Sequence, residues 1–207
     1  MAQAGNAAMD SHEWCLFPKD GYENMTQAGE PKATAKLQRI KQRYEREGMR
    51  RSVYAVCLMN VHGHPAAIMF NAGESGADRL VGGVIKPGES DRDGLNRKLR
   101  KYILRASAAD ACEWKVGEML GQWWRPNFDE KIYPYLPPHV TRPKECIKLY
   151  QVVLPSKCVF GVPPGTRLVA VPLFELVGQG ANYPPHIAAL PSLVSRFGMA
   201  VYAMSTE

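Results

Sequence analysis

The stretch from residue 82 to residue 104 combines a glycine-rich loop that ends in an acid with a strongly basic helix. Gly82 and Gly83 begin the loop, Glu89 ends it, and a helix is predicted after Glu89. That helix carries Arg97, Lys98, Arg100 and Lys101. Mg²⁺ needs several oxygen ligands, and its charge is what activates a water molecule. Because Glu89 alone is a poor ligand set and the cations of the helix would repel the ion, this stretch predicts no metal-assisted hydrolysis.

Structural roles alone also explain the stretch. The Gly-Gly and Pro-Gly pairs are typical of a tight loop, and Ser90 or Asp91 is a typical N-cap. Leu95, Leu99 and Ile103 recur at helical spacing, so we expect a helix that buries one apolar stripe.

The composition favours one globular domain with short extensions. The chain has 207 residues, of which 45% are hydrophobic and 22% charged. Its formal charge of +6 and pI near 9.1 favour a polyanionic partner, although a solvated basic surface is the alternative. There is no run of eighteen apolar residues and no secretion signal in residues 1–30, so we expect an intracellular protein without a membrane span.

The cysteines and histidines predict no metal site. The five cysteines are widely spread and lack a CxxC pair, and Cys57 falls in a strand pattern typical of core. His62 and His64 flank Gly63 in a predicted turn. Such a pair can bind a metal, but no third ligand is spaced to join it, so turn chemistry is the preferred interpretation.

Periodicity predicts strands framed by helices. We read residues 1–30 as a partly disordered N-terminal arm, residues 31–200 as the domain, and residues 201–207 as a tail. A basic helix is expected over residues 33–47, ending at Gly48. Strands are expected over residues 51–60, 66–70, 114–124, 147–154 and 166–171, and helices near 172–177 and 186–197. This pattern favours an α/β fold, an α/β/α sandwich with a mixed sheet.

Two segments carry a specific family resemblance. Residues 121–128 read GQWWRPNF, and residues 133–145 read YPYLPPHVTRPKE. Three more segments support them, namely residues 48–51, 168–176 and 190–197. In order and spacing these segments resemble the small, Nudix-fold subunit of cleavage factor I, which acts in pre-mRNA 3′-end processing. The resemblance covers roughly residues 33–197.

The stretch from residue 82 to residue 104 is similar to a Nudix box that has lost its glutamates. Gly83, Glu89 and Arg97 match the box at the right spacing. Where the family has Glu, this chain has Lys98, Lys101 and Tyr102. The resemblance therefore implies a Nudix fold without hydrolase activity, with no cofactor and no bound metal.

The family also implies partners and a location. It implies a nuclear homodimer that binds single-stranded pre-mRNA at UGUA and holds a larger subunit through that subunit's RNA-recognition-motif domain. Two alternatives stay open. One is a pure scaffold for dimerisation and partner contacts, without RNA. The other is a nucleotide-sensing inactive Nudix protein, in which Arg97, Lys98 and Lys101 hold a dinucleoside polyphosphate.

Four residues are candidates for RNA binding. Tyr183 matches a family tyrosine, Lys36 stands where the family has Arg, and Tyr54 where it has an RNA-facing acid. Arg79, at the start of a strand, is within reach of the cleft, although a plain surface role and, for Tyr54, a core role are alternatives. The family's aromatic pair is absent from residues 74–78, Ala28 replaces a Glu, and Pro184 replaces a Gly. These departures leave the RNA sequence preference open.

Three residues are candidates for partner binding. Tyr133 and Tyr135 match the tyrosines that contact the larger subunit, and Val194 aligns with a leucine of the same surface. The alternative is a Tyr-Pro loop packed on its own domain. Trp123 and Trp124 must face opposite sides of a strand, so one of them is expected in the core.

Overall fold

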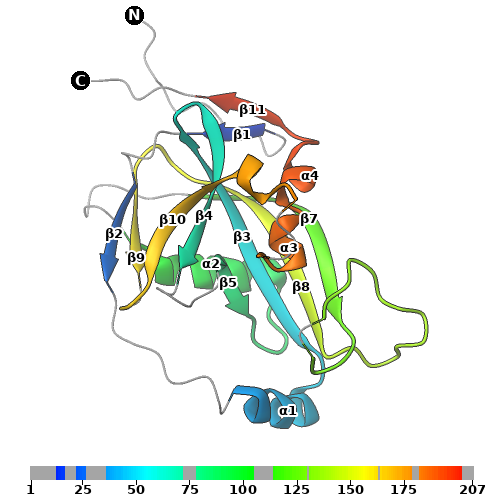
Figure 1. The fold of residues 1–207 in the computed structure, drawn as a ribbon. Helices are drawn as coiled ribbons and strands as arrows, with labels where there is room; N and C mark the ends of the chain where they lie inside the picture. Colours follow the sequence, from blue (N-terminus) through cyan, green and yellow to red (C-terminus); the bar gives the residue numbers. More distant parts are fainter. Residues whose placement is uncertain are drawn as a thin grey trace, which may run out of the picture.

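The computed structural model describes residues 13–16, 22–26, 36–71, 78–104, 114–129, 131–162, 164–178 and 182–201. Its centre is a six-stranded sheet of order β10-β4-β5-β3-β8-β7 (Figure 1). These strands are β3 (Arg50–Val61), β4 (His64–Asn71), β5 (Arg79–Val84), β7 (Lys115–Arg125), β8 (Glu145–Val153) and β10 (Arg167–Pro172). β3 and β8 run parallel and their other pairings are antiparallel, so the sheet is mixed, as predicted.

Alternation along β3 divides the core into two layers. Val53, Ala55 and Cys57 point to one face, where α2 (Asp91–Tyr102) buries Leu95 and Leu99. Val56 and Leu58 point to the other face, where 3₁₀ helix η3 (Leu173–Leu176), α3 (Pro185–Ala188) and α4 (Leu190–Val194) pack. Successive residues of a strand face opposite sides of a sheet, so the continuous apolar run of β3 contributes side chains to both layers of the core. The α/β/α sandwich predicted from the sequence is confirmed.

Smaller sheets complete the α2 side and one end of the molecule. β2 (Tyr22–Thr26), β9 (Cys158–Val162) and β6 (Ile103–Leu104) form a three-stranded sheet. β1 (Glu13–Leu16) pairs in parallel with β11 (Gly198–Val201). Two segments of the predicted arm therefore pair with the domain, while the boundary near residue 30 stays a prediction.

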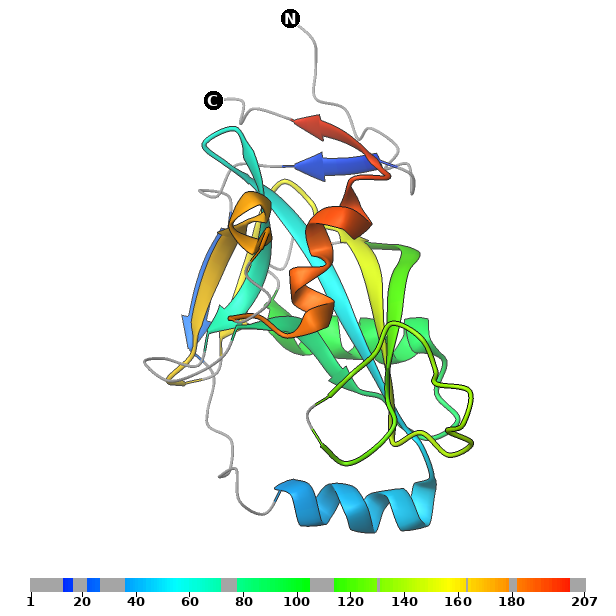
Figure 2. The ribbon, with the colours of Figure 1, turned by 45° about the vertical axis from the view of Figure 1, so that its right-hand side comes forward.

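Helix α1 (Lys36–Glu47) lies across one end of the sheet (Figure 1). It ends at Gly48, whose φ of +75° suits a residue without a side chain, as predicted. Tyr44 joins α1 to the connection between β7 and β8, because its ring meets Phe128 edge to face at 5.5 Å. Figure 2 shows this connection extending beside the end of the sheet above α1.

The C-terminal helix differs from its prediction. Residues 186–197 were expected to form one helix, but the chain forms α3 and α4, separated at Ala189. Pro191 lacks the N–H that would continue the hydrogen-bond ladder from α3, which explains the break. β6, β9 and β11 are strands that periodicity did not predict. No helix in the described part of the chain is long and apolar enough to cross a membrane.

Candidate functional site

The loop after β5 holds Glu89 against α2. Ser90 caps α2 by accepting a hydrogen bond from the backbone N–H of Asp93. Arg97 then donates through Nε to Oε1 of Glu89 at 2.8 Å and through Nη2 to Oε2 at 2.7 Å. The hydrogen bond from Arg97 is the main reason that the pKa of Glu89 is lowered to about 2. Both carboxylate oxygens of Glu89 therefore already have donors.

The residues around Glu89 do not fit a Mg²⁺ ion. Across the ranges that the structure describes, no group of three or more His, Cys, Asp or Glu side chains could hold a metal. The ammonium of Lys98 lies 3.5 Å from the position that a Cβ on Gly83 would take, so a cation fills the space between loop and helix. Since Mg²⁺ requires oxygen ligands, we derive no reaction step through a metal here.

Asp91 is likewise engaged within the protein. Its carboxylate accepts hydrogen bonds from Arg51, from Lys148 Nζ at 2.6 Å and from the Tyr150 hydroxyl at 3.1 Å. Burial alone would raise the pKa of Asp91, but the hydrogen bonds from Lys148 and Arg51 lower it overall. This cluster links the start of α2 to β3 and β8, so it fixes the position of the helix.

The opposite face of the sheet carries a second group of polar residues, which are half-buried. Tyr54 projects from β3 toward α3, where its ring lies 6.0 Å from that of His186. β3 and β5 are very close here, because a Cβ on Gly82 would lie 2.2 Å from the carbonyl oxygen of Val53. Only glycine fits at that position, so the tight β5 backbone sets where Tyr54 lies.

Tyr183 lies on the same face as Tyr54, whereas Arg79 is paired with Phe70, whose side chain belongs to the α2 layer. Tyr183 packs against the same core cluster as Tyr54 and is hydrogen-bonded to Asp78. Arg79 is exposed, and its charge acts on the Tyr54 hydroxyl. The structure thus brings two of the four predicted RNA-binding residues, Tyr54 and Tyr183, to one face, and Arg79 lies at the start of β5 with its register on the other face. The fourth, Lys36, begins α1, and its side chain lies outside the described residues, as do Ala28 and residues 74–77.

A buried ion cluster links the strands that carry this face. Glu145 is 4% exposed and accepts a hydrogen bond from Ser52 at 2.5 Å. Arg50 and Arg125 each place Nε 3.0 Å from one of its carboxylate oxygens. A buried carboxylate with two guanidinium partners and a hydroxyl donor is well satisfied, so this cluster joins β3, β7 and β8 firmly.

His186 is a polar residue of this face that sequence reasoning missed. Its ring lies between Tyr54 and Trp123, and its Nδ1 is buried without a hydrogen-bond partner in the described part of the chain. Burial lowers the pKa of His186 to about 4, so the ring is neutral at neutral pH. Neither His186 nor Glu145 lies in a sequence pattern that indicates these contacts, because strands and helices distant in the sequence bring the partners together.

The predicted partner loop exposes one tyrosine and anchors the other. Tyr133 pairs with Trp124 through two backbone hydrogen bonds of 2.7 and 2.8 Å. The ring of Tyr135 lies 5.9 Å from that of Tyr133, and Tyr135 is 58% exposed. Trp123 is buried, while Trp124 is half-buried. The prediction that one of these adjacent strand residues lies in the core is therefore confirmed. The loop therefore presents an aromatic side chain on a fixed backbone.

The structure corrects the prediction for Val194. Its side chain is fully buried in the core, so it presents no surface to another chain. Neighbouring helical residues point in different directions, and it is Leu193 that stays partly exposed beside Gly121 on β7. Leu193 therefore replaces Val194 as the candidate from α4.

Comparison with known proteins places this arrangement in a family. The family model NUDIX_2, described as a nucleotide hydrolase, matches residues 12–197. Over 162 residues the chain is 46% identical to pre-mRNA cleavage factor Im 25 kDa subunit 2 of Arabidopsis thaliana, covering 78% of this chain and 80% of that protein. The chain belongs to this family of Nudix-fold cleavage factor subunits.

A second relative agrees. The chain is 40% identical over 169 residues to cleavage and polyadenylation specificity factor subunit 5 of Dictyostelium discoideum, covering 81% of this chain and 84% of that protein. The family resemblance and the Nudix fold predicted from the sequence are therefore confirmed. Because Glu89 is paired with Arg97, the hydrolase description of the wider family does not by itself transfer to this Nudix-fold subunit.

Proposed function

We propose that this protein is a non-catalytic subunit of the machinery that cleaves and polyadenylates pre-mRNA. The observation that carries the proposal is the Glu89–Arg97 pair, found in a chain that is 46% identical to a cleavage factor subunit. In that pair the acid of the Nudix loop is neutralised by the helix that would otherwise hold a metal. The scaffold then serves recognition rather than hydrolysis.

The recognised molecule is single-stranded RNA. Proteins bind single-stranded RNA by stacking its bases on flat side chains, while cations meet its phosphates. Tyr54 and Tyr183 provide aromatic rings on the α3 face, and Arg79 and Lys36 provide charge. A net charge of +6 favours the same partner. A UGUA element remains the sequence we propose to test first.

The second partner is a larger subunit with an RNA-recognition-motif domain. An exposed tyrosine on a proline-rich loop is the kind of rigid anchor that is enriched at interface hot spots. Tyr135 has this exposure, and Tyr133 supports it through its bridge to Trp124 of β7. We further propose that the protein acts as a homodimer in the nucleus, in line with the role named for its relatives.

Titration with labelled RNA at fixed salt tests the proposal. Purified protein is mixed with a short RNA containing UGUA, and separately with the same RNA in which the G is changed. We expect tight binding that weakens on the order of tenfold when the G changes, as loss of a base contact predicts. Equal binding would leave a charge-driven RNA clamp, and no binding would favour the pure scaffold.

A second assay addresses hydrolysis. The protein is incubated with Mg²⁺ and a dinucleoside polyphosphate, and the products are separated by chromatography. We expect no turnover above that of a heat-denatured sample. Turnover that depends on Glu89 would contradict the non-catalytic assignment.

A further inference from the structure

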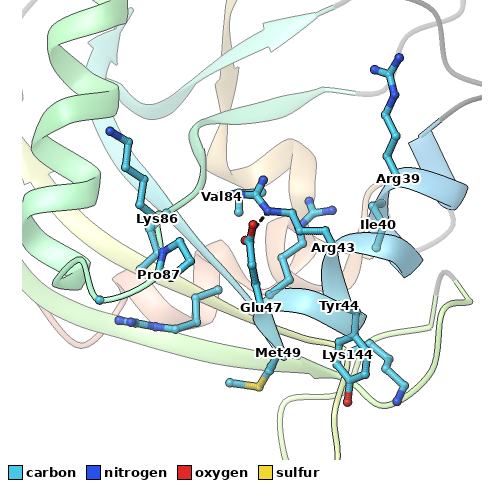
Figure 3. Close-up of a pocket in the computed structure, with 15 residues that line it drawn as sticks. Arg39, Ile40, Arg43, Tyr44, Glu47, Met49, Val84, Lys86, Pro87 and Lys144 are labelled. Atoms are coloured by element: carbon cyan, nitrogen blue, oxygen red, sulfur yellow. Dashed lines mark hydrogen bonds and ion pairs between the residues drawn. The ribbon is translucent and has the colours of Figure 1, made fainter.

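A basic pocket lies apart from the α3 face. Its volume is about 400 Å³, and it is formed by α1, the start of β3 and the loop before α2. Tyr54, Arg79 and Tyr183 do not line it. Figure 3 shows Lys86, from the loop, and Arg39, from α1, on either side of the Arg43–Glu47 pair.

The pocket is lined by many more positive than negative side chains. Its lining includes one carboxylate, Glu47, and six cations, which are Arg39, Arg43, Arg50, Arg51, Lys86 and Lys144. Glu47 is already bound by Arg43 at 2.6 Å. In the described part of the chain, no carboxylate lies within ion-pairing distance of Arg39 or Lys86, whereas Arg50 and Arg51 pair with Glu145 and Asp91. A concentration of cations of this kind attracts phosphate groups.

The lining of the pocket also has an apolar and aromatic part. Ile40, Met49 and Pro87 contribute to it. Tyr44 adds a ring, and the Lys144 ammonium lies 4.2 Å from its centroid. Cations together with apolar and flat groups match a ligand that carries phosphates and a base or sugar. The chemical class is therefore a nucleoside phosphate.

The position of the pocket indicates where this ligand comes from. Arg39 and Arg43 are spaced i and i+4 along α1, so they share one stripe of the helix. The same helix begins at Lys36, the candidate RNA residue. We propose that the pocket binds a nucleotide of the same RNA strand outside the recognised element, with its phosphates on Arg39, Arg43 and Lys86. The inference rests on the proposed RNA binding.

A length series with matched variants tests the inference. A short RNA that carries only the recognised element is compared with RNAs extended on the 5′ side, the 3′ side or both. The pocket variant is Arg39→Gln/Lys86→Gln. The control is Arg100→Gln/Lys157→Gln, which removes the same charge from two exposed residues that do not line the pocket. All titrations are repeated at several salt concentrations.

We expect wild-type protein to bind one extended RNA more tightly than the short one, on the order of tenfold. The pocket variant should lose this gain and bind the short RNA within about twofold of wild type. For the extended RNA, the slope of log affinity against log salt should be shallower by about 1.4 in the pocket variant than in wild type. Each phosphate contact on a single strand contributes about 0.7 to this slope, and the variant removes two cations. The control variant should keep the gain.

Other outcomes would overturn the inference in distinguishable ways. If wild-type protein binds the short RNA but gains nothing from any extension, the pocket is not on the RNA path and the proposed function stands. If ATP binds wild-type protein and not the pocket variant, while extensions have no effect, the pocket takes a free nucleotide instead. If no RNA binds at all, the proposed function fails and this inference fails with it.

Discussion

The loop before α2 and the α3 face of the sheet use their polar side chains in opposite ways. In the loop, Glu89 is held by Arg97, and Asp91 is held by Arg51 and Lys148. On the α3 face, the rings of Tyr54 and Tyr183 pack against the core but stay only half-buried. The first region is satisfied within the protein and stabilises the fold. The second retains aromatic surface on which a base can stack, so binding is expected there.

The largest expected effect comes from the buried cluster below the α3 face. Glu145→Ala would remove a buried carboxylate and leave the half-buried Arg50 and Arg125 without their partner. We expect the free energy of unfolding to fall by about 3 kcal/mol or more, measured by urea denaturation. Glu47→Ala is the control, because it breaks a partly exposed ion pair and should cost less than about 1 kcal/mol. Similar losses for both variants would show that the cluster does not support this face.

The next effect is a pH dependence of stability. The pKa of His186 is lowered to about 4 in the folded protein, from its ordinary value of 6.5. Between these values the unfolded chain binds a proton that the folded chain does not, so stability falls as the pH falls through this window. The loss is up to about 3 kcal/mol, from 1.36 kcal/mol per unit of pKa.

Thermal unfolding from pH 7 to pH 4 measures this dependence. His186→Gln keeps a polar side chain without a titrating group, so it should lose less stability than wild type over the same range. If both proteins lose stability equally, His186 is not the group responsible and its burial beside Tyr54 is not as described.

Removal of an aromatic ring separates the two surfaces by function. Tyr183→Ala should weaken RNA binding on the order of tenfold, because stacking on an aromatic side chain contributes about 1–3 kcal/mol per base. Tyr135→Ala removes an exposed ring of the partner loop and should leave RNA affinity within about twofold. Fluorescence anisotropy measures both. Equal losses would mean that RNA contacts both surfaces.

The partner loop predicts the converse result. Tyr135→Ala should weaken binding to the RNA-recognition-motif domain of the larger subunit on the order of tenfold, measured by calorimetry, because exposed tyrosines are common hot spots. Leu193→Ala should have a smaller effect in the same direction. Val194→Ala should instead lower stability, because that side chain is fully buried. Direct loss of partner affinity in a stable Val194→Ala protein would restore the prediction made from the sequence.

The smallest expected effect belongs to the loop before α2. Glu89→Gln removes the charge that pairs with Arg97 but leaves the α3 face unchanged. We expect RNA affinity within about twofold of wild type. Because the pKa of Glu89 is lowered to about 2, the stabilising charge is present above the ordinary pKa of Glu and is lost as the pH falls toward 2. A large change in RNA affinity would place part of the binding site on this loop.

The sequence predicted the regular elements because their signals are local. The cap at Ser90, the stripe of Leu95 and Leu99, and the stop at Gly48 each depend on neighbouring residues, and the structure confirms them. The break between α3 and α4 was missed, since the apolar spacing of residues 186–197 continues through Pro191. β9 was missed because its apolar run is short.

The candidate site was less predictable because it depends on distant contacts. Glu145 and its partners come from β3, β7 and β8, and no sequence spacing relates them. His186 follows two prolines and carries no motif. Val194 and Leu193 are adjacent in sequence, so only the direction of α4 against the sheet decides which one is buried. Alignment to a family shows which residues of this chain match the family's binding residues. Whether the side chain of such a residue is exposed can be learned only from the packed structure.

Crosslinking tests the central claim most directly, namely that RNA binds the α3 face and not the loop before α2. RNA carrying a photoactivatable uridine is bound at physiological salt, irradiated and digested, and the modified peptides are identified by mass spectrometry. We expect crosslinks on peptides that contain Tyr54 or Tyr183. Crosslinks confined to the peptides that contain Glu89 and Arg97 would contradict the claim.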